Sequence, residues 1–502
     1  MTGRLAVGLA CALAAALVGS RAGATNGDRL PASVTSAERT GRPAASVADP
    51  EFAANDPLLP LQWYVPAGRV LAAWASPPTL PRVRVAIIDS GVDLGHPDLA
   101  GRVIEARSFV GGSAADRTGH GTIVAGLIAA GIDNGIGIVG LAPSAELLVA
   151  RVVTNGLTIP LRAEAKAIRW AVDRGAQVIN MSFGGLRDPT DASRDTYSQI
   201  EADAIRYAVS KGVVVVAAVG NGDDAPRQPW PYASYPAALP HVLGVGALTR
   251  KGGVPPYSNQ DAVLTDIVAP GVDIVSTFPR SLTAKRPACE EQGYTLCATP
   301  EFEDVSGTSF AAPQVTAAVA NLLAVAPTLT ADQAIAVLVR AARDLGPEGA
   351  CRRCAAGHDA PSGYGRLDGA AALAGAIAAP PPDTLEPNDD AGAGARRLSG
   401  LGPIEATLDR YDDRNDVYAV RLRKGDRLGV QLTSSNATSV AVLTPAVSSL
   451  ADLHKRPALI LARSRSRREH DFTSGSAPLA GWYGVRVQLT AGGRASYRLE
   501  LT

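Results

Sequence analysis

From Val83 to Leu373 the chain alternates short apolar runs with longer stretches in which apolar residues recur every three to four positions. The short runs have the length of strands, and the longer stretches have the period of helices that bury one face. Strands are predicted at Val83–Ile88, Glu146–Val153, Val178–Met181, Val213–Val219 and Val242–Val245, and helices at Thr122–Ala130, Pro160–Asp173, Gln199–Lys211 and Pro313–Ala324. Apolar strands that alternate with helices are typical of an α/β fold, with a mostly parallel sheet covered by helices on both faces.

The pattern changes after the proline-rich segment Ala378–Asp383. Beyond it, apolar and polar residues alternate with period two in Asp416–Leu422, Arg427–Thr433 and Gly481–Leu489, with no helical pattern between them. This alternation predicts a small all-β sandwich. We therefore expect an α/β domain over residues 55–379, a linker over residues 380–384 and a C-terminal β-sandwich over residues 385–502.

The first 24 residues have the pattern of a signal peptide. Arg4 precedes the apolar stretch Leu5–Val18, and the small residues of Ala22–Ala24 provide a cleavage site. The stretch is shorter than the about 20 residues that a membrane span needs, although an uncleaved anchor is the alternative. Residues 25–54 are polar and rich in Ala and Pro, and predict a leader or wrapping segment. We expect a secreted protein without a transmembrane anchor in the mature chain.

The net charge bears on the possible partners, and the cysteines bear on the choice between disulfides and a metal site. The chain has 48 basic and 48 acidic residues, so nothing in its charge favours nucleic acid as a partner. Four cysteines remain after a signal peptide, and export to an oxidising compartment favours disulfides. Three pairings are possible, and we favour Cys289–Cys297 and Cys351–Cys354 because each closes a short loop. A zinc site on Cys351, Cys354 and His358 is the alternative.

Three separated segments carry candidate chemistry. Ser309 lies in Ser-Gly-Thr-Ser-Phe-Ala-Ala-Pro, which can begin a helix whose unpaired N–H groups stabilise a negative oxygen. A serine hydroxyl attacks only when a base takes its proton. His120, in Gly-His-Gly-Thr, supplies a base, and Asp89, at the end of an apolar run, supplies a carboxylate to orient it. Taken singly, these residues are ordinary: a helix cap, a loop histidine and a turn aspartate.

The chain order Asp89, His120, Ser309 is the order found in subtilisin, and the three segments resemble those of the subtilisin-like serine proteases. The resemblance extends from about Asn55 to about Leu373 and includes Asn180–Gly185, Val213–Asn221, Tyr257–Gly271 and Gly363–Asp368. It implies a secreted serine endopeptidase that forms an acyl-enzyme at Ser309, with Asn221 stabilising the oxyanion. The alternative is a catalytically silent secreted binding protein on the same fold.

The resemblance also implies polypeptide substrates that bind as extended strands. The predicted contacts are the strand Ser182, Phe183, Gly184 and Gly185 and the pocket wall Ala218, Val219 and Gly220. This small, apolar wall favours a large apolar side chain before the scissile bond. Asp223 and Asp224 would instead favour a basic side chain if they point into the pocket; solvation of the turn is the role that we expect for them.

No cofactor is expected for the chemistry. Asp98, Asn134 and the carbonyls of Ile136 and Ile138 align with a calcium loop of the family, which implies a structural Ca²⁺. The tail is similar to pre-peptidase C-terminal domains in Leu385–Asp389, Asp416–Tyr418 and Ala480–Val487. A polymer, a cell surface and the protease itself are all open as its partner. We expect a monomer.

Overall fold

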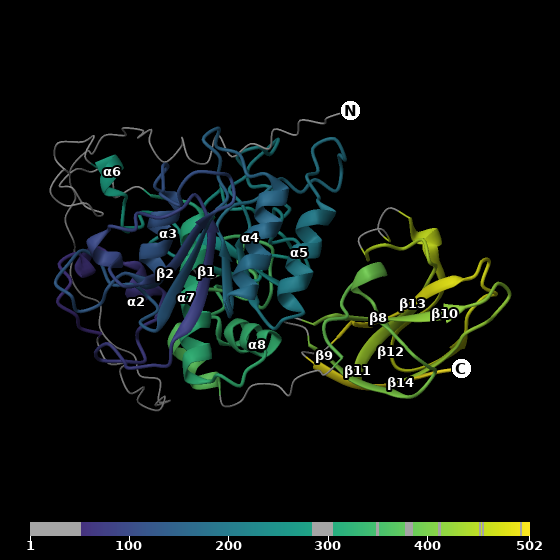
Figure 1. The fold of residues 1–502 in the computed structure, drawn as a ribbon. Coiled ribbons are helices and arrows are strands. Elements are labelled where there is room, and N and C mark those ends of the chain that lie inside the picture. Colours follow the sequence, from purple (N-terminus) through teal and green to yellow (C-terminus); the bar gives the residue numbers. More distant parts are fainter. Residues whose placement is uncertain are drawn as a thin grey trace, which may run out of the picture.

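The computed structural model describes residues 52–283, 305–347, 351–376, 385–409, 413–450, 453, 456–491 and 494–502. The predicted signal peptide, nearly all of the leader and the linker lie outside these residues, as do Cys289 and Cys297. Figure 1 shows an α/β domain, in purple to green, beside a smaller β domain in green to yellow.

The α/β domain is built on a seven-stranded sheet in which every neighbouring pair is parallel. The strand order is β2 (Val103–Ser108), β3 (Ala145–Arg151), β1 (Val83–Asp89), β4 (Val178–Met181), β5 (Val214–Ala218), β6 (Val242–Leu248) and β7 (Ile267–Pro270). All five predicted strands are present. Because the sheet is parallel, the carboxyl ends of its strands share one edge, where sites of such folds are found.

Helices cover both faces of the sheet, as predicted (Figure 1). Along β1, Val85 and Ile87 belong to a core shared with α3 (His120–Ala129) and α7 (Thr308–Val325). The alternate residues, Ala86 and Ile88, belong to a second core shared with α4 (Leu161–Asp173) and α5 (Gln199–Val209). Burial of both faces explains why the strands are apolar throughout. The remaining helices of this domain are η1 (Leu59–Leu61), α2 (Tyr64–Gly68), η2 (Pro97–Leu99), α6 (Arg280–Thr283), α8 (Ala331–Ala341) and α9 (Gly369–Gly375).

Helix α7 begins at Thr308, five residues before the predicted start at Pro313. A proline inside a helix lacks the N–H that would bond to the carbonyl four residues earlier. That carbonyl belongs to Ser309, and it accepts a hydrogen bond from the Ser182 hydroxyl at 2.7 Å instead. Helix α7 is also the one described helix that is long and apolar enough to cross a membrane, but 94% of it is buried inside the protein.

The C-terminal domain is all β, as predicted. Its strands are β8 (Arg396–Arg397), β9 (Ile404–Asp409), β10 (Asn415–Leu422), β11 (Gly429–Leu443), β12 (Ile460–Thr473), β13 (Gly481–Leu489) and β14 (Arg494–Leu501), with short helices η6 (Gly392–Gly394) and η7 (Pro457–Leu459). The pairs are antiparallel except β8 with β10. Strand β11 pairs with β14 over Val430–Ser434 and with β13 over Thr438–Leu443, so it links β8, β10 and β13 to β14 and β9 in one sheet.

Two buried carboxyl groups lie between α4 and α5. Glu164 and Glu201 are 2% and 4% exposed and share a side-chain hydrogen bond. Burial raises the pKa of both groups, and each charge would repel the other. A carboxyl pair that shares a hydrogen bond must hold at least one proton. Above the unfolded-state pKa, the folded protein therefore keeps a proton that the unfolded chain has released.

This pair makes stability fall as the pH rises. The contribution is complete below the unfolded-state pKa of about 4.5 and is lost as the pH rises through the higher folded-state values, with a slope of up to about 1.4 kcal/mol per pH unit for each extra proton. We expect Glu201→Gln, which stays neutral, to reduce the loss in free energy of unfolding between pH 5 and pH 9, measured by urea denaturation. Glu105→Gln is the control, at a half-buried carboxylate that pairs with Arg174. An unchanged pH slope in Glu201→Gln would contradict this role.

Candidate active site

Asp89 is the last residue of β1, and its side chain faces the imidazole of His120. The carboxylate is 2% exposed. His120 Nδ1 lies 2.8 Å from Asp89 Oδ1 and 3.0 Å from Oδ2. The N–H of Ser90 donates to Oδ1 at 2.6 Å, which fixes the carboxylate at the carboxyl edge of the sheet. A carboxylate held in this way orients the ring and favours the tautomer with its proton on Nδ1.

His120 is the first residue of α3, and two glycines allow the chain to bring it there. Gly119 has a φ of 97°, in the left-handed region that favours glycine. A Cβ on Gly121 would lie 2.2 Å from the carbonyl oxygen of Gly91, so only glycine lets α3 approach the end of β1 so closely. Burial lowers the pKa of His120, but the charge and hydrogen bond of Asp89, with the charge of Asp116, outweigh it and raise the pKa above 6.5.

Asp116 shapes the loop before His120, although no sequence motif identifies it. It is 3% exposed. Its Oδ1 accepts hydrogen bonds from the Ser90 hydroxyl at 2.9 Å and from the N–H of Gly119 at 2.9 Å, and its Oδ2 accepts from the N–H of Thr122 at 2.9 Å. One carboxylate therefore joins the turn after β1 to the first turn of α3. The contact with Ser90 spans 26 residues of sequence, whereas those with Gly119 and Thr122 depend on the local conformation of the loop.

Ser309 is the second residue of α7, at the end of the helix where backbone N–H groups lack partners. It is 8% exposed. Its hydroxyl donates to the carbonyl of Ser182 at 2.9 Å, and among the described residues it makes no hydrogen bond to His120. The ring of Phe310 lies beside the imidazole, with 5.4 Å between the ring centroids. Ser309 and His120 line the same cavity.

Asn221 follows β5 and is held by Thr308. Its Oδ1 accepts from both the N–H and the hydroxyl of Thr308, each at 2.9 Å. Because Oδ1 accepts from Thr308, Asn221 donates through Nδ2, which is also within hydrogen-bonding reach of the Asp223 carboxyl group. Asn221 lines the cavity beside Ser309. Thr308 is a further residue that sequence reasoning did not select, although it belongs to the Gly-Thr-Ser motif.

Five of the seven residues predicted to contact substrate line the cavity, and two do not. Ser182, Phe183, Gly184, Ala218 and Gly220 line the cavity. Gly185 instead exchanges two backbone hydrogen bonds with Tyr235, at 2.9 and 3.0 Å. Val219 is fully buried and bonds to Val245 through its N–H at 3.0 Å. The contacts of Gly185 and Val219 with substrate stay predictions.

Asp223 and Asp224 also line this cavity. Burial raises the pKa of Asp223, and the neighbouring charge of Asp224 raises it further. Burial raises the pKa of Asp224 as well. Both residues line the cavity and remain exposed to solvent, so solvation of the turn stays a prediction.

The residues of the predicted calcium loop lie together. Asp98 Oδ2 accepts from the N–H of Ile138 at 2.9 Å, and Oδ1 accepts from the Asn134 amide at 3.0 Å. Asn134 Oδ1 accepts from the N–H of Ile136 at 2.8 Å. Because protein N–H groups already use these oxygens, the arrangement does not require a cation. The calcium site stays a prediction, and we assign it no role in the chemistry.

One of the two predicted disulfides lies within the described residues and is present. Cys351 and Cys354 form a disulfide, with their Cα atoms 5.4 Å apart. His358 Nε2 lies 3.1 Å from the carbonyl of Thr265. The alternative zinc site on these three residues is therefore absent from the structure. The pairing of Cys289 with Cys297 lies outside the described residues.

Comparison with known proteins gives the same family as the motifs. Residues 81–357 match the profile of the subtilase family. The chain is 34% identical to subtilisin DY of Bacillus licheniformis over 53% of this chain and 85% of that protein. It is 36% identical to thermitase of Thermoactinomyces vulgaris, over 48% and 74% of the two chains, and 34% identical to the major intracellular serine protease of Bacillus subtilis, over 49% and 70%. The chain belongs to the subtilase family and is a subtilisin-like serine endopeptidase.

Proposed function

We propose that this endopeptidase cleaves peptide bonds through an acyl-enzyme on Ser309, with His120 as the base, Asp89 as its orienting carboxylate and Asn221 as an oxyanion donor. The observation that carries the proposal is the two-oxygen contact of Asp89 with His120 Nδ1, in the cavity that Ser309 and Asn221 also line. A proton on Nδ1 leaves the Nε2 lone pair available to accept the serine proton.

The reaction begins when the Ser309 hydroxyl turns from the carbonyl of Ser182 toward His120. Ser309 Oγ attacks the scissile carbonyl, and its proton passes to His120 Nε2. The resulting oxyanion accepts hydrogen bonds from Asn221 Nδ2 and from the N–H of Ser309. His120 then gives its proton to the leaving amine as the C–N bond breaks. Water, activated by the same imidazole, hydrolyses the ester and restores the hydroxyl.

The proposal is tested directly with the purified chain. We expect hydrolysis of casein, complete inhibition by phenylmethylsulfonyl fluoride, and no effect of a chelator on the initial rate. The alternative, a silent binding protein, predicts no hydrolysis and no reaction with a fluorophosphonate, and those two results together would replace our proposal.

Asn221→Ala is expected to lower kcat by about 10²–10³, the size of such a loss in subtilisin, with little change in KM. Thr308→Ala removes one of the two hydrogen bonds that hold Asn221 Oδ1, and a smaller decrease in kcat of about three- to tenfold follows, because one hydrogen bond contributes about 0.5–1.5 kcal/mol. Steady-state kinetics on a chromogenic peptide measure both. Equal kcat values for Asn221→Ala and wild type would remove Asn221 from the oxyanion site.

Asp223 and Asp224 lead us to propose a preference for Lys or Arg before the scissile bond, in place of the large apolar residue expected from the sequence. Carboxyl groups on the cavity wall attract a cation most strongly once solvent is displaced. We expect Asp223→Asn with Asp224→Asn to lower kcat/KM for Lys and Arg substrates about tenfold relative to Leu and Phe substrates. A peptide library measures this ratio. An unchanged ratio of kcat/KM between basic and apolar substrates would mean that both residues only solvate the turn.

We also propose that residues 1–24 export the protein and that it acts outside the cell. The support is the signal-like sequence, since family membership does not decide the compartment: one relative is named as an intracellular protease. N-terminal sequencing of the protein from the culture medium tests this, and intact Met1 on protein found only in the cytoplasm would contradict it.

A further inference from the structure

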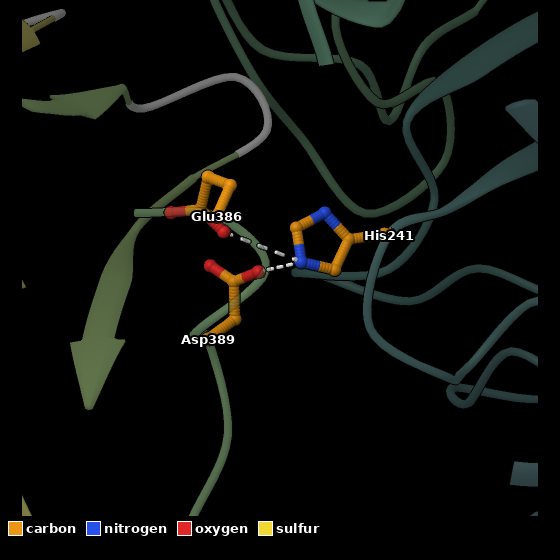
Figure 2. A group of neighbouring side chains, drawn as sticks. All are labelled: His241, Glu386 and Asp389. Atoms are coloured by element: carbon orange, nitrogen blue, oxygen red, sulfur yellow. Dashed lines mark ion pairs between the residues drawn. The ribbon is translucent and has the colours of Figure 1, made fainter. Parts of the chain in front are cut away.

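Ionisable side chains of the two domains meet at a buried point between them. The α/β domain contributes His241, which immediately precedes β6, and Asp332, from the first turn of α8. The C-terminal domain contributes Glu386 and Asp389, which lie shortly before β8. Figure 2 shows the carboxyl groups of Glu386 and Asp389 on the same side of the imidazole, directed at one ring nitrogen.

Each nitrogen of His241 faces a carboxyl group. Nδ1 lies 3.2 Å from Asp332 Oδ1. Nε2 is in contact with Asp389 Oδ2 and lies 3.7 Å from Glu386 Oε2. This is the arrangement of a metal-binding histidine: a carboxylate accepts the Nδ1 proton and fixes the tautomer, and the Nε2 lone pair then points at the other ligands. Without a positive charge between them, that lone pair would face two oxygens that are also electron-rich.

The residues of the group are only partly buried, but their side chains are little exposed. The exposed fractions of the side chains are 6% for His241, 7% for Glu386 and 11% for Asp389. Glu386 Oε2 accepts a hydrogen bond from the N–H of Asn388 at 3.0 Å, whereas Oε1 is buried without a hydrogen-bond partner among the described residues. A carboxylate oxygen that is removed from water and left without a donor requires a cation or a proton.

Negative charge is in excess around Glu386. Among the described residues, His241 is the one basic neighbour that favours the charged form of Glu386, while Asp332, Asp389 and Asp416 oppose it. Even a protonated imidazole therefore leaves an excess of buried negative charge, which is unfavourable at low dielectric. Glu386, Asp413 and Asp416 form a second, all-carboxyl group, but acidic residues alone do not define a site, and we assign it none.

We propose that His241 Nε2, Glu386 and Asp389 bind a divalent transition-metal ion of the zinc class, with Asp332 orienting the imidazole, and that this ion joins the C-terminal domain to the α/β domain. The ligand atoms of the three residues lie within 4.8 Å of one another, which leaves room for a central ion. One nitrogen and two carboxylate oxygens suit Zn²⁺, with water completing the coordination, whereas Ca²⁺ and Mg²⁺ prefer oxygen alone.

The position separates this ion from peptide hydrolysis. His241 is at the amino end of β6, whereas Asp89 is at the carboxyl end of β1, so the two sites lie at opposite edges of the parallel sheet. The ion would act on the attachment of the C-terminal domain, which also contacts the α/β domain through a hydrogen bond of 2.8 Å from Arg414 Nη2 to the hydroxyl of Tyr364.

The experiment uses the full chain, inactivated with phenylmethylsulfonyl fluoride and stripped with a chelator. Zn²⁺ is titrated by calorimetry, and Co²⁺ is used as a visible spectroscopic probe. We expect about one Zn²⁺ per chain, a higher Tm with Zn²⁺, and d–d absorption bands with Co²⁺. His241→Gln and Glu386→Gln should lower the affinity at least tenfold and remove the bands, and Asp332→Asn should lower it about 10–100-fold. The exposed Glu405→Gln is the matched control.

Other results would overturn the proposal. If the stripped wild-type chain binds no Zn²⁺ and its Tm does not respond to the ion, His241 makes ion pairs only. If His241→Gln and Glu386→Gln bind Zn²⁺ as tightly as wild type, the ion lies elsewhere. If Ca²⁺ binds in place of Zn²⁺ and His241→Gln leaves its affinity unchanged, the ion lies elsewhere, at the all-carboxyl group or in the loop of Asp98 and Asn134. Because the wild-type titration and the Co²⁺ spectrum need no variant, a variant that fails to fold does not prevent the test.

Discussion

Ser309→Ala is expected to abolish peptide hydrolysis, with kcat lowered by about 10⁶, the size of this replacement in subtilisin, from which we take it. The reason is chemical, since alanine offers no oxygen to form the acyl-enzyme. The fold should be retained, because the Ser309 carbonyl still accepts the hydrogen bond from the Ser182 hydroxyl and Pro313 remains in place. Hydrolysis of a chromogenic peptide measures kcat, and thermal unfolding verifies the fold.

Ser306→Ala is the matched control for this replacement. Ser306 lies three residues away in the same segment, and its hydroxyl accepts a hydrogen bond from the N–H of Asp273 at 3.2 Å. We expect its kcat to stay within a few-fold of wild type. Activity in Ser309→Ala above about one thousandth of wild type, in a preparation free of contaminating protease, would mean that another group attacks the substrate.

Asp89→Asn is expected to lower kcat by about 10⁴ and to change the pH dependence of what remains. The asparagine amide can donate to Nδ1, which places the imidazole proton on Nε2, where it blocks acceptance of the serine proton. Asp89 also raises the pKa of His120 through its charge and hydrogen bond, against the lowering effect of burial. Its removal therefore lowers that pKa.

The pH profile distinguishes these effects from simple misfolding. Only the neutral imidazole is a base, so activity rises as the pH passes through the pKa of His120. We expect the midpoint of the acidic limb of kcat/KM above pH 6.5 in wild type and at lower pH in Asp89→Asn. Asp93→Asn, a change at a half-buried carboxylate in the turn after β1, should keep both activity and midpoint. An Asp89→Asn profile that coincides with wild type would remove Asp89 from the mechanism.

Much of the fold could be predicted because buried strands carry a strong local signal. Strand β4 has the predicted bounds, Val178–Met181, since all four residues are buried. The missed strands have weaker patterns. Strand β2 lies at the edge of the sheet, and polar residues interrupt it. Strand β7 is as short as β4, but it ends in Pro270 and is followed by Gly271, which are typical of a turn. The early start of α7 could not be predicted because Pro313 lacks an N–H, and the hydroxyl of Ser182, just after β4, replaces the missing hydrogen bond.

The candidate site could be predicted only as far as its motifs extend. Asp89, His120, Asn221 and Ser309 each stand in a short, recognisable segment, and the structure brings all four to one cavity. Asp116 acts through hydrogen bonds to several backbone groups, which depend on the conformation of the loop and leave no pattern in the sequence.

The contacts between the two domains could not be predicted from the sequence. His241 follows an ordinary turn before β6, and Glu386 and Asp389 lie in the segment before β8, where no catalytic or metal-binding motif is present. Their convergence depends on how the two domains pack together, which no periodicity or spacing within either domain encodes.

Reaction of the full chain with a fluorophosphonate, followed by mass spectrometry of its peptides, tests the proposed nucleophile most directly. We predict one adduct, on Ser309, which forms on the folded wild-type chain and is lost in His120→Ala and after denaturation. An adduct on a different residue, or no adduct on a folded chain that hydrolyses casein, would contradict the mechanism.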